Sequence, residues 1–156
     1  MTFFYQFKIQ LWDTAGLERA GRMTSNYYNY SHAVLLMYDV TDLSSLGGLQ
    51  MWYDNAVRDS NNNSNTLYFL VGNKIDETPG SIEVSENRAV SYAADVIKLP
   101  TENTISFRIS AKTGEGLNNL LEEVARILSG SKHQQKPDND NIIIDRIDGG
   151  KKKGCC

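Results

Sequence analysis

Cysteine and histidine are scarce in this sequence. It contains two cysteines, adjacent at Cys155 and Cys156, and two histidines, His32 and His133, which lie far apart. A disulfide framework needs cysteines distributed through the domain, and a zinc site needs several cysteines or histidines at close spacing. The body of the chain therefore contains neither, and we expect the two terminal cysteines to begin as free thiols.

Long apolar runs and an excess of basic residues are also missing. No run approaches the roughly 20 apolar residues that a membrane-spanning helix needs. Residues 1–12 lack the charged start, apolar block and small-residue cleavage site of a signal peptide. The net charge is −3, which gives no nucleic-acid signature. We expect a cytoplasmic protein that does not bind nucleic acid.

Charge is divided unevenly along the chain. Residues 1–129 hold ten Lys/Arg and fifteen Asp/Glu, whereas residues 130–156 hold six and four. We interpret residues 1–129 as one domain and residues 130–156 as a flexible basic tail that is attracted to anionic membrane surfaces. The apolar stretch Ile142-Ile143-Ile144 interrupts that tail. It is either incidental or a segment that docks on the domain, on a partner or on a prenylation chaperone.

Apolar, strand-like runs alternate with segments of helical periodicity, which predicts an α/β fold with a mostly parallel sheet. The continuous apolar run 67–72 is typical of a central strand covered on both faces. We expect strands at 3–12, 33–39, 67–72 and 105–109, and helices near 20–30 and at 46–58, 86–98 and 116–128.

Three short segments stand out, and each follows one of the expected strands. They are Trp12-Asp13-Thr14-Ala15-Gly16, Gly72-Asn73-Lys74-Ile75-Asp76 and Ser110-Ala111-Lys112. In open parallel sheets, ligands bind at the carboxyl ends of the strands. The position of all three segments therefore indicates a common binding site.

The second and third segments carry the groups that reading guanine requires. The Asp76 carboxylate can accept from the ring N–H and the exocyclic amine of guanine, a donor pair that adenine does not present. Asn73 can bond the purine edge, and the stems of Lys74 and Lys112 can cover the two faces of the base. Ser110-Ala111-Lys112 brings a backbone N–H toward the guanine carbonyl. The first segment places the Asp13 carboxylate and a flexible glycine, Gly16, where a γ-phosphate and Mg²⁺ would lie.

This constellation resembles the small GTPases, and the Rab branch in particular. Besides the three segments, the resemblance rests on Lys8-Ile9-Gln10-Leu11, Tyr27-Tyr28, Met37-Tyr38-Asp39-Val40-Thr41 and the terminal Cys155-Cys156. It covers roughly residues 7–128 and the last two. It implies a Ras-like P-loop NTPase fold that binds GTP or GDP with Mg²⁺ and acts as a switch in vesicle traffic.

The resemblance also implies roles for particular residues. Asp13 would reach Mg²⁺ through water, and Ala15 and Gly16 would approach the γ-phosphate. Guanine would be held by Asn73, Lys74, Asp76, Ser110, Ala111 and Lys112. Cys155 and Cys156 would carry geranylgeranyl groups, placing the protein on the cytosolic face of an intracellular membrane. Partners would be the prenylation machinery, exchange factors and effectors.

One part of the family's pattern does not occur here. The phosphate-binding loop G-x-x-x-x-G-K-[ST] is absent from all 156 residues, and only eleven residues precede Trp12, too few for the preceding strands and switch I. The fold expected is therefore a partial one, without its first strands. Either the true start lies upstream, the reading we favour, or the short chain cannot bind nucleotide normally.

Two positions depart from the Rab pattern within the matched region. Leu17 stands where Rabs carry the glutamine that orients the attacking water, so we expect slow GTP hydrolysis and assign no catalytic residue. Another residue, or one from a partner, is the alternative means of positioning that water. Ala20-Gly21 replaces a usual aromatic of the effector-reading surface. A non-enzymatic, lipid-anchored adaptor is the rival function, and GDP affinity separates the two.

Overall fold

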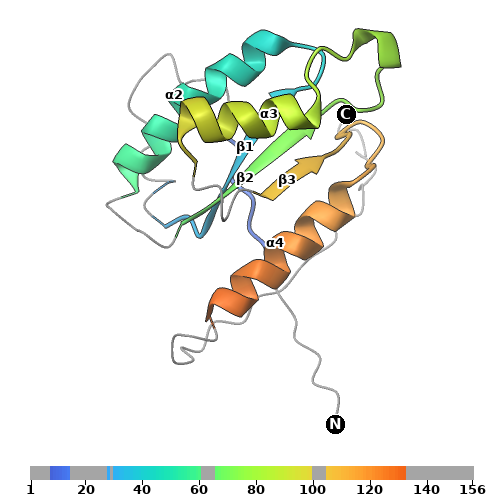
Figure 1. Cartoon of the computed structure of the whole chain (residues 1–156). Coiled ribbons are helices and arrows are strands. Elements are labelled where there is room, and N and C mark those ends of the chain that lie inside the picture. Colours follow the sequence, from blue (N-terminus) through green and yellow to red (C-terminus); the bar gives the residue numbers. More distant parts are fainter. Residues whose placement is uncertain (1–7, 15–27, 29, 61–65, 100–104, 133–156) are drawn as a thin grey trace, which may run out of the picture.

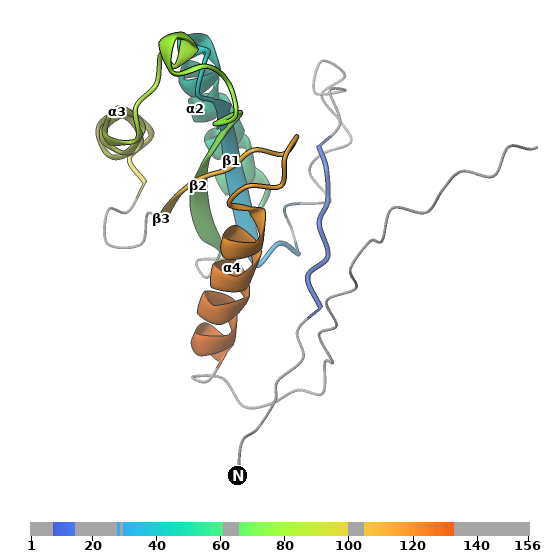
Figure 2. The same ribbon diagram turned by 90° about the vertical axis from the view of Figure 1, so that its right-hand side faces the viewer.

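The computed structural model describes residues 8–14, 28, 30–60, 66–99 and 105–132. Helices flank a sheet on both sides, with α2 and α3 over one face and α4 over the other (Figures 1 and 2). The elements in chain order are β1 (Ala33–Asp39), α2 (Leu43–Asp59), β2 (Leu67–Asn73), the 3-10 turn η2 (Pro79–Ser81), α3 (Glu86–Tyr92), the π-helical turn η3 (Ala93–Ile97), β3 (Ile105–Arg108) and α4 (Leu117–Lys132).

Within the described residues the sheet has three strands in the order β1-β2-β3, and both pairings are parallel. Asp39 is in register with Asn73, and Gly72 with Arg108, so the three strands end at one edge. The α/β class, the parallel sheet and the central position of the 67–72 run are confirmed. The expected strands 33–39, 67–72 and 105–109 agree with the observed bounds to within one residue.

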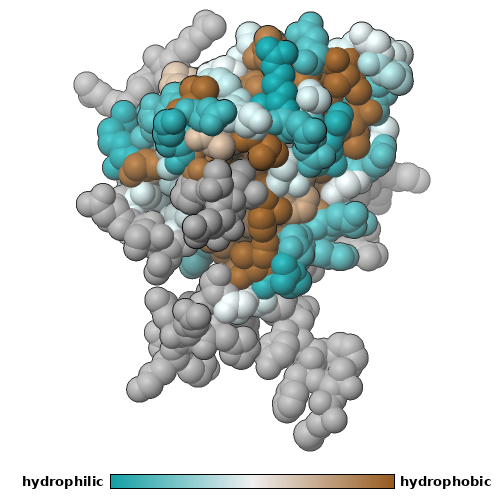
Figure 3. Space-filling model, viewed as in Figure 1, coloured by the Kyte–Doolittle hydropathy of each residue, from teal (hydrophilic) through white to brown (hydrophobic). Residues whose placement is uncertain are grey.

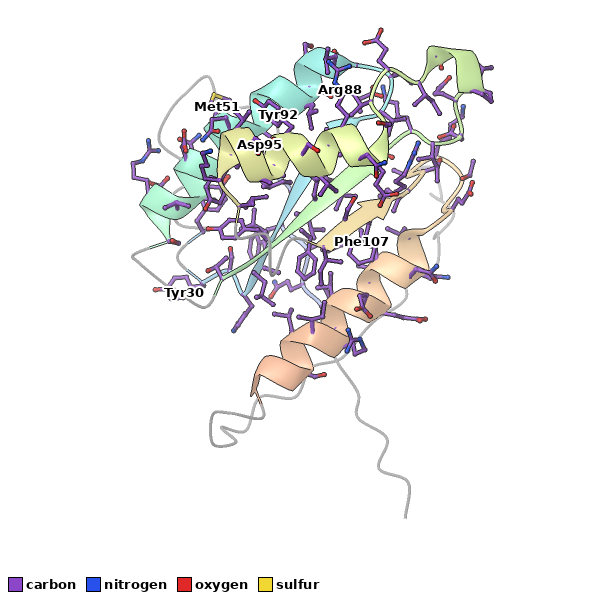
Figure 4. All side chains as sticks on the ribbon, in the orientation of Figure 1. Tyr30, Met51, Arg88, Tyr92, Asp95 and Phe107 are labelled. Atoms are coloured by element: carbon purple, nitrogen blue, oxygen red, sulfur yellow. The ribbon has the colours of Figure 1, made fainter. Side chains whose placement is uncertain are left out.

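The central strand β2 sends alternate side chains into two separate cores, as the pleat of a strand requires. Leu70 packs with Leu36 and Tyr38 of β1 beneath α2 and α3. Phe69 and Val71 pack on the opposite face with Leu120 and Val124 of α4. Phe107 of β3 lies between the sheet and α4 (Figure 4). Figure 3 shows hydrophobic atoms at the surface where α4 meets the sheet, beside the hydrophilic outer face of that helix.

Three helices differ from their predicted bounds. The expected helix 116–128 spans Leu117–Lys132 as α4, so residues 130–132, which we expected in the flexible tail, belong to the helix. The expected helix 46–58 begins at Leu43, because Asp42 caps it by accepting a hydrogen bond from the Ser44 N–H. The expected helix 86–98 is α-helical only to Tyr92 and then turns π-helical, ending where Lys98 adopts a left-handed conformation. Ser85 caps α3 by accepting a hydrogen bond from the Arg88 N–H at 3.3 Å. The Tyr92 hydroxyl donates to the Gly47 carbonyl at 3.3 Å and joins α3 to α2 (Figure 4).

The predicted strand 3–12 is wrong for the part that the structure describes. Residues 8–14 form irregular chain that has no strand pairing and runs apart from β1 (Figure 2). Leu11 and Trp12 leave 65% and 62% of their surface exposed. The alternating pattern of this segment fits a strand, but a strand needs a neighbour to satisfy its backbone groups. The expected helix near 20–30 lies, apart from Tyr28 and Tyr30, outside the described residues, as does the tail from residue 133 onward.

Candidate functional site

The candidate site lies at the edge where the three parallel strands end. Backbone hydrogen bonds join the strands and their loops there: the Ile109 N–H donates to the Gly72 carbonyl at 2.8 Å, and the Ile75 N–H donates back to the Ile109 carbonyl at 3.3 Å. On the other side, the Val40 N–H donates to the Asn73 carbonyl at 3.0 Å. The loops after β1, β2 and β3 therefore start from one rigid framework.

Asn73 ties two of these loops together through a single atom. Its Oδ1 accepts from the Lys74 N–H at 2.8 Å and from the Ala111 N–H at 2.9 Å. The first bond holds Lys74 in a left-handed conformation with φ of 70°, which a residue with a side chain rarely adopts. We expected a backbone N–H of the segment 110–112 to approach the guanine carbonyl, and this stays a prediction. In the structure, the Ala111 N–H donates to Asn73.

Asp76 and the segment 110–112 face one another across the same edge. The Ser110 hydroxyl donates to Asp76 Oδ1 at 2.6 Å, and Lys112 Nζ lies 3.3 Å from Asp76 Oδ2. The Asp76 side chain is 11% exposed, whereas that of Lys112 is 77% exposed. The Ser110 hydrogen bond, helped by Lys112, holds the pKa of Asp76 below its usual value of 3.8, so the group is a carboxylate at neutral pH.

Ser110 is held by the turn that connects β3 to α4. It is fully buried, and its Oγ accepts from the Thr113 N–H at 3.0 Å while donating to Asp76. Its backbone N–H donates to the Glu115 carbonyl at 2.9 Å. The turn closes against the strand at Gly116, where φ is 73° and a Cβ would lie 2.4 Å from the Arg108 carbonyl oxygen. Only glycine fits there without moving the turn.

Sequence reasoning gave no role to Asp39, which the structure places in the site. Its Oδ2 pairs with Lys74 Nζ at 2.5 Å, while its Oδ1 accepts from the N–H and the hydroxyl of Thr41 at 2.9 and 2.7 Å. Burial by itself would raise the pKa of Asp39, but the bonds from Lys74 and Thr41 outweigh it and the pKa is lowered. The sequence offered one signal for this position, because Asp39 is the last residue of the expected strand 33–39, which pairs with β2.

The predicted phosphate and metal residues are not joined to this edge. Asp13 is exposed in the irregular segment 8–14, and no hydrogen bond or ion pair among the described residues links it to Asn73, Asp76 or Ser110. Ala15, Gly16, Leu17, Cys155 and Cys156 lie outside the described residues. Within the part of the chain that is described, there is no group of three His, Cys, Asp or Glu residues placed to hold a metal ion. That part likewise has no helix with the length and apolarity for crossing a bilayer.

The edge can bind a planar ligand that presents two adjacent N–H donors. The Asp76 oxygens are hydrogen-bond acceptors, and Oδ2 faces Lys112, whose side chain is 77% exposed. Lys112 has its apolar stem beside this carboxylate, whereas the ammonium of Lys74 pairs with Asp39. The binding of guanine at this edge stays a prediction.

Comparison with known proteins identifies the class. A family model described as the Ras family matches residues 3–129. Rab-34 of Rattus norvegicus is 34% identical over 165 residues, covering 96% of this chain and 61% of its own length. RABD2a of Arabidopsis thaliana is 33% identical, covering 96% of this chain and 71% of its own length. The protein YPT1 of Saccharomyces cerevisiae, described as GTP-binding, is 36% identical over 82% of this chain and 58% of its own length.

The chain therefore belongs to the Ras family of small GTPases and, within it, to the Rab type. It spans 61% of the length of the first of these relatives.

Proposed function

We propose that the chain is a guanine-nucleotide-dependent switch of the Rab type, which binds GTP and GDP and controls vesicle traffic at an intracellular membrane. The observation that supports this most is the pairing of Asp76 with Ser110 beside Asn73 and Ala111. Two loops that are distant in the sequence meet there. The Ser110 hydroxyl donates to Asp76 Oδ1 at 2.6 Å, and Asp76 Oδ2 faces the exposed Lys112. Such a carboxylate selects guanine over adenine.

The residues proposed to hold guanine are Asn73, Lys74, Asp76, Ser110, Ala111 and Lys112. Asp13, Ala15 and Gly16 are proposed to face the γ-phosphate and Mg²⁺, with Asp13 acting on the metal through water. Mg²⁺, when bound, would neutralise phosphate charge. The described residues hold no group of three His, Cys, Asp or Glu placed to bind the ion.

Hydrolysis is proposed to be slow. Leu17 has no donor or acceptor with which to orient an attacking water. Replacing it by Leu17→Gln should raise the single-turnover rate of GTP hydrolysis if the chain binds GTP, and equal rates in the two proteins would show that another group positions the water.

Membrane attachment is proposed to occur through geranylgeranyl groups on Cys155 and Cys156, beside Lys151, Lys152 and Lys153. Two lipid chains give durable anchoring where one gives marginal binding. Replacing both cysteines by serine should move the protein from the membrane fraction to the soluble fraction in cells. Continued membrane association of that variant would argue against a lipid anchor.

A non-enzymatic adaptor is the second candidate. Such a protein would keep the lipid anchor and compete for prenylation machinery, exchange factors or effectors.

GDP binding by the chain decides between the two functions. Isothermal titration of the purified 156-residue protein with GDP in the presence of Mg²⁺ is the direct measurement. Saturable binding that adenosine diphosphate does not reproduce supports the switch. Absence of any GDP binding at millimolar concentration would instead favour the adaptor.

A further inference from the structure

Lys74 is anchored at both of its ends, which is unusual for a half-exposed lysine. Its backbone N–H is bonded to Asn73 Oδ1 at 2.8 Å, and its ammonium pairs with Asp39 Oδ2 at 2.5 Å. The side chain between them is 54% exposed, so packing alone does not fix its conformation. A free lysine side chain of this exposure samples many rotamers, because four of its torsions turn independently.

Asp39 is itself fixed before it meets Lys74. Its Oδ1 is used by the N–H and the hydroxyl of Thr41, which orients the carboxylate and leaves Oδ2 for one partner. The Asp39 backbone N–H donates to Ser45 Oγ at 2.9 Å, which ties the same residue to the first turn of α2. The Asp39 side chain is only 20% exposed. The acceptor is thus oriented by Thr41 and Ser45, which follow β1 in the chain rather than β2 or β3.

The strand register places the Asp39 carboxylate within reach of the Lys74 ammonium. Asp39 ends β1 directly opposite Asn73 at the end of β2, and Lys74 is the next residue. The Lys74 stem therefore runs from the end of β2 to the end of β1, at the edge where the strands end.

We infer that Asp39 is a positioning residue, which holds the stem of Lys74 in one conformation as a preformed wall for the base. This inference rests on the proposed function, because the wall serves a guanine ring. Asp39 does not touch the base in this arrangement. Its contribution is that binding no longer has to immobilise a flexible lysine, so less entropy is lost when the ring docks.

A double-mutant cycle tests the inference on the full chain. GDP affinity is measured for the unmodified protein, Asp39→Asn, Lys74→Ala and the double variant. We expect Asp39→Asn to weaken GDP binding about tenfold, and to have little further effect once Lys74 is alanine. Asp95→Asn is the matched control, because Asp95 is an exposed carboxylate on η3, outside the loops that carry Asp39 and Lys74. An equal loss from Asp39→Asn in both backgrounds, or no loss in either, would overturn the inference.

A second measurement separates this inference from the proposed function. Proton and carbon NMR of the lysine side chains reports whether the Lys74 methylene protons next to the ammonium are distinct, as in a fixed conformer, or averaged. We expect distinct signals in the unmodified protein and averaged ones in Asp39→Asn. Averaged signals in both proteins would overturn the inference even if GDP binds. A protein without GDP binding but with this difference would overturn the proposed function and leave the hold of Asp39 on Lys74 established.

Discussion

Two regions that should serve one ligand differ sharply in how they are held. The edge formed by residues 73–76 and 110–112, where we propose that the base is read, is crossed by hydrogen bonds between loops that lie 34 to 38 residues apart in the chain. The segment 8–14, which carries Asp13, is exposed and has no strand partner in the described part of the chain. Each loop of the edge follows a strand that is paired in the sheet. The contrast shows that a motif is held in a defined geometry when it follows a strand that is paired in the sheet. A motif without a paired strand has the same residue types, but no strand pairing fixes their positions.

The largest expected effect comes from altering the base-reading carboxylate. Asp76→Asn replaces an acceptor by a side-chain amide, which can donate to the second carbonyl of xanthine but cannot accept both guanine donors. We expect the ratio of GDP to xanthosine diphosphate affinity to fall by about a hundredfold or more, as when a site built for one hydrogen-bond pattern meets another. Competition titration measures it. Asp95→Asn, an exposed site on η3, is the control, and an unchanged ratio in Asp76→Asn would mean that this edge does not read the base.

The next effect concerns the turn that carries Ser110. Gly116→Ala should lower the free energy of unfolding by roughly 2–3 kcal/mol, because the new Cβ meets the Arg108 carbonyl in a left-handed conformation. Gly114→Ala is the matched control, since Gly114 has a φ of 84° but nothing within 4 Å of its Cβ position. It should cost about 1 kcal/mol. Urea unfolding compares the two, and equal losses would show that the close approach at residue 116 relaxes freely.

Replacing Ser110 or Ser106 by alanine should change the stability of the protein by smaller amounts and in opposite directions. Ser110→Ala should destabilise the protein by about 1–2 kcal/mol, because it removes a buried donor to Asp76 and an acceptor for the Thr113 N–H. Ser106 Oγ is buried and has no hydrogen-bond partner among the described residues, so Ser106→Ala should be neutral or stabilising. Thermal unfolding of both variants tests this, and a larger loss from Ser106→Ala would reverse the assignment.

Ser110→Ala should also change how the free energy of unfolding depends on pH at acid pH. The folded pKa of Asp76 lies below 3.8, so its stabilising contribution is present above that pH and is lost as the pH falls below it toward the folded pKa. Removing the Ser110 hydroxyl should raise the pKa of Asp76 toward its ordinary value and reduce that loss. Carbon NMR titration of the Asp76 carboxyl follows the shift, and an unchanged titration would mean that Lys112 holds the carboxylate alone.

The smallest effect is expected at the other end of the comparison. Asp13→Ala should leave the urea midpoint unchanged, because Asp13 is exposed and is joined to none of the base-reading residues within the described ranges. A clear loss of stability would show that the segment 8–14 packs more firmly in solution than its exposure indicates, and the contrast between the two regions would then fail.

The sequence predicted correctly that the loops 73–76 and 110–112 meet at one edge of the sheet, but it predicted the segment 8–14 poorly, and both outcomes have physical reasons. The apolar run of β2 and the motifs after β2 and β3 are local signals, and parallel strands bring their ends together without further information. The alternation of Phe7, Ile9 and Leu11 is also a local signal, but forming a strand depends on a neighbouring strand that no local pattern reports. Asp39 was missed because its role depends on the register between β1 and β2, which appears only when the strands are paired.

The exposure of Trp12 allows the segment 8–14 and the core to be compared by tryptophan fluorescence. The chain has only two tryptophans, and the other, Trp52 of α2, is partly buried against the core beneath α2 and α3. Indole emission shifts to longer wavelength in water, so the two rings contribute separable bands. Replacing either ring by phenylalanine leaves a single reporter, one for the core and one for the chain beside Asp13, with which any docking of that segment can be timed in stopped-flow mixing.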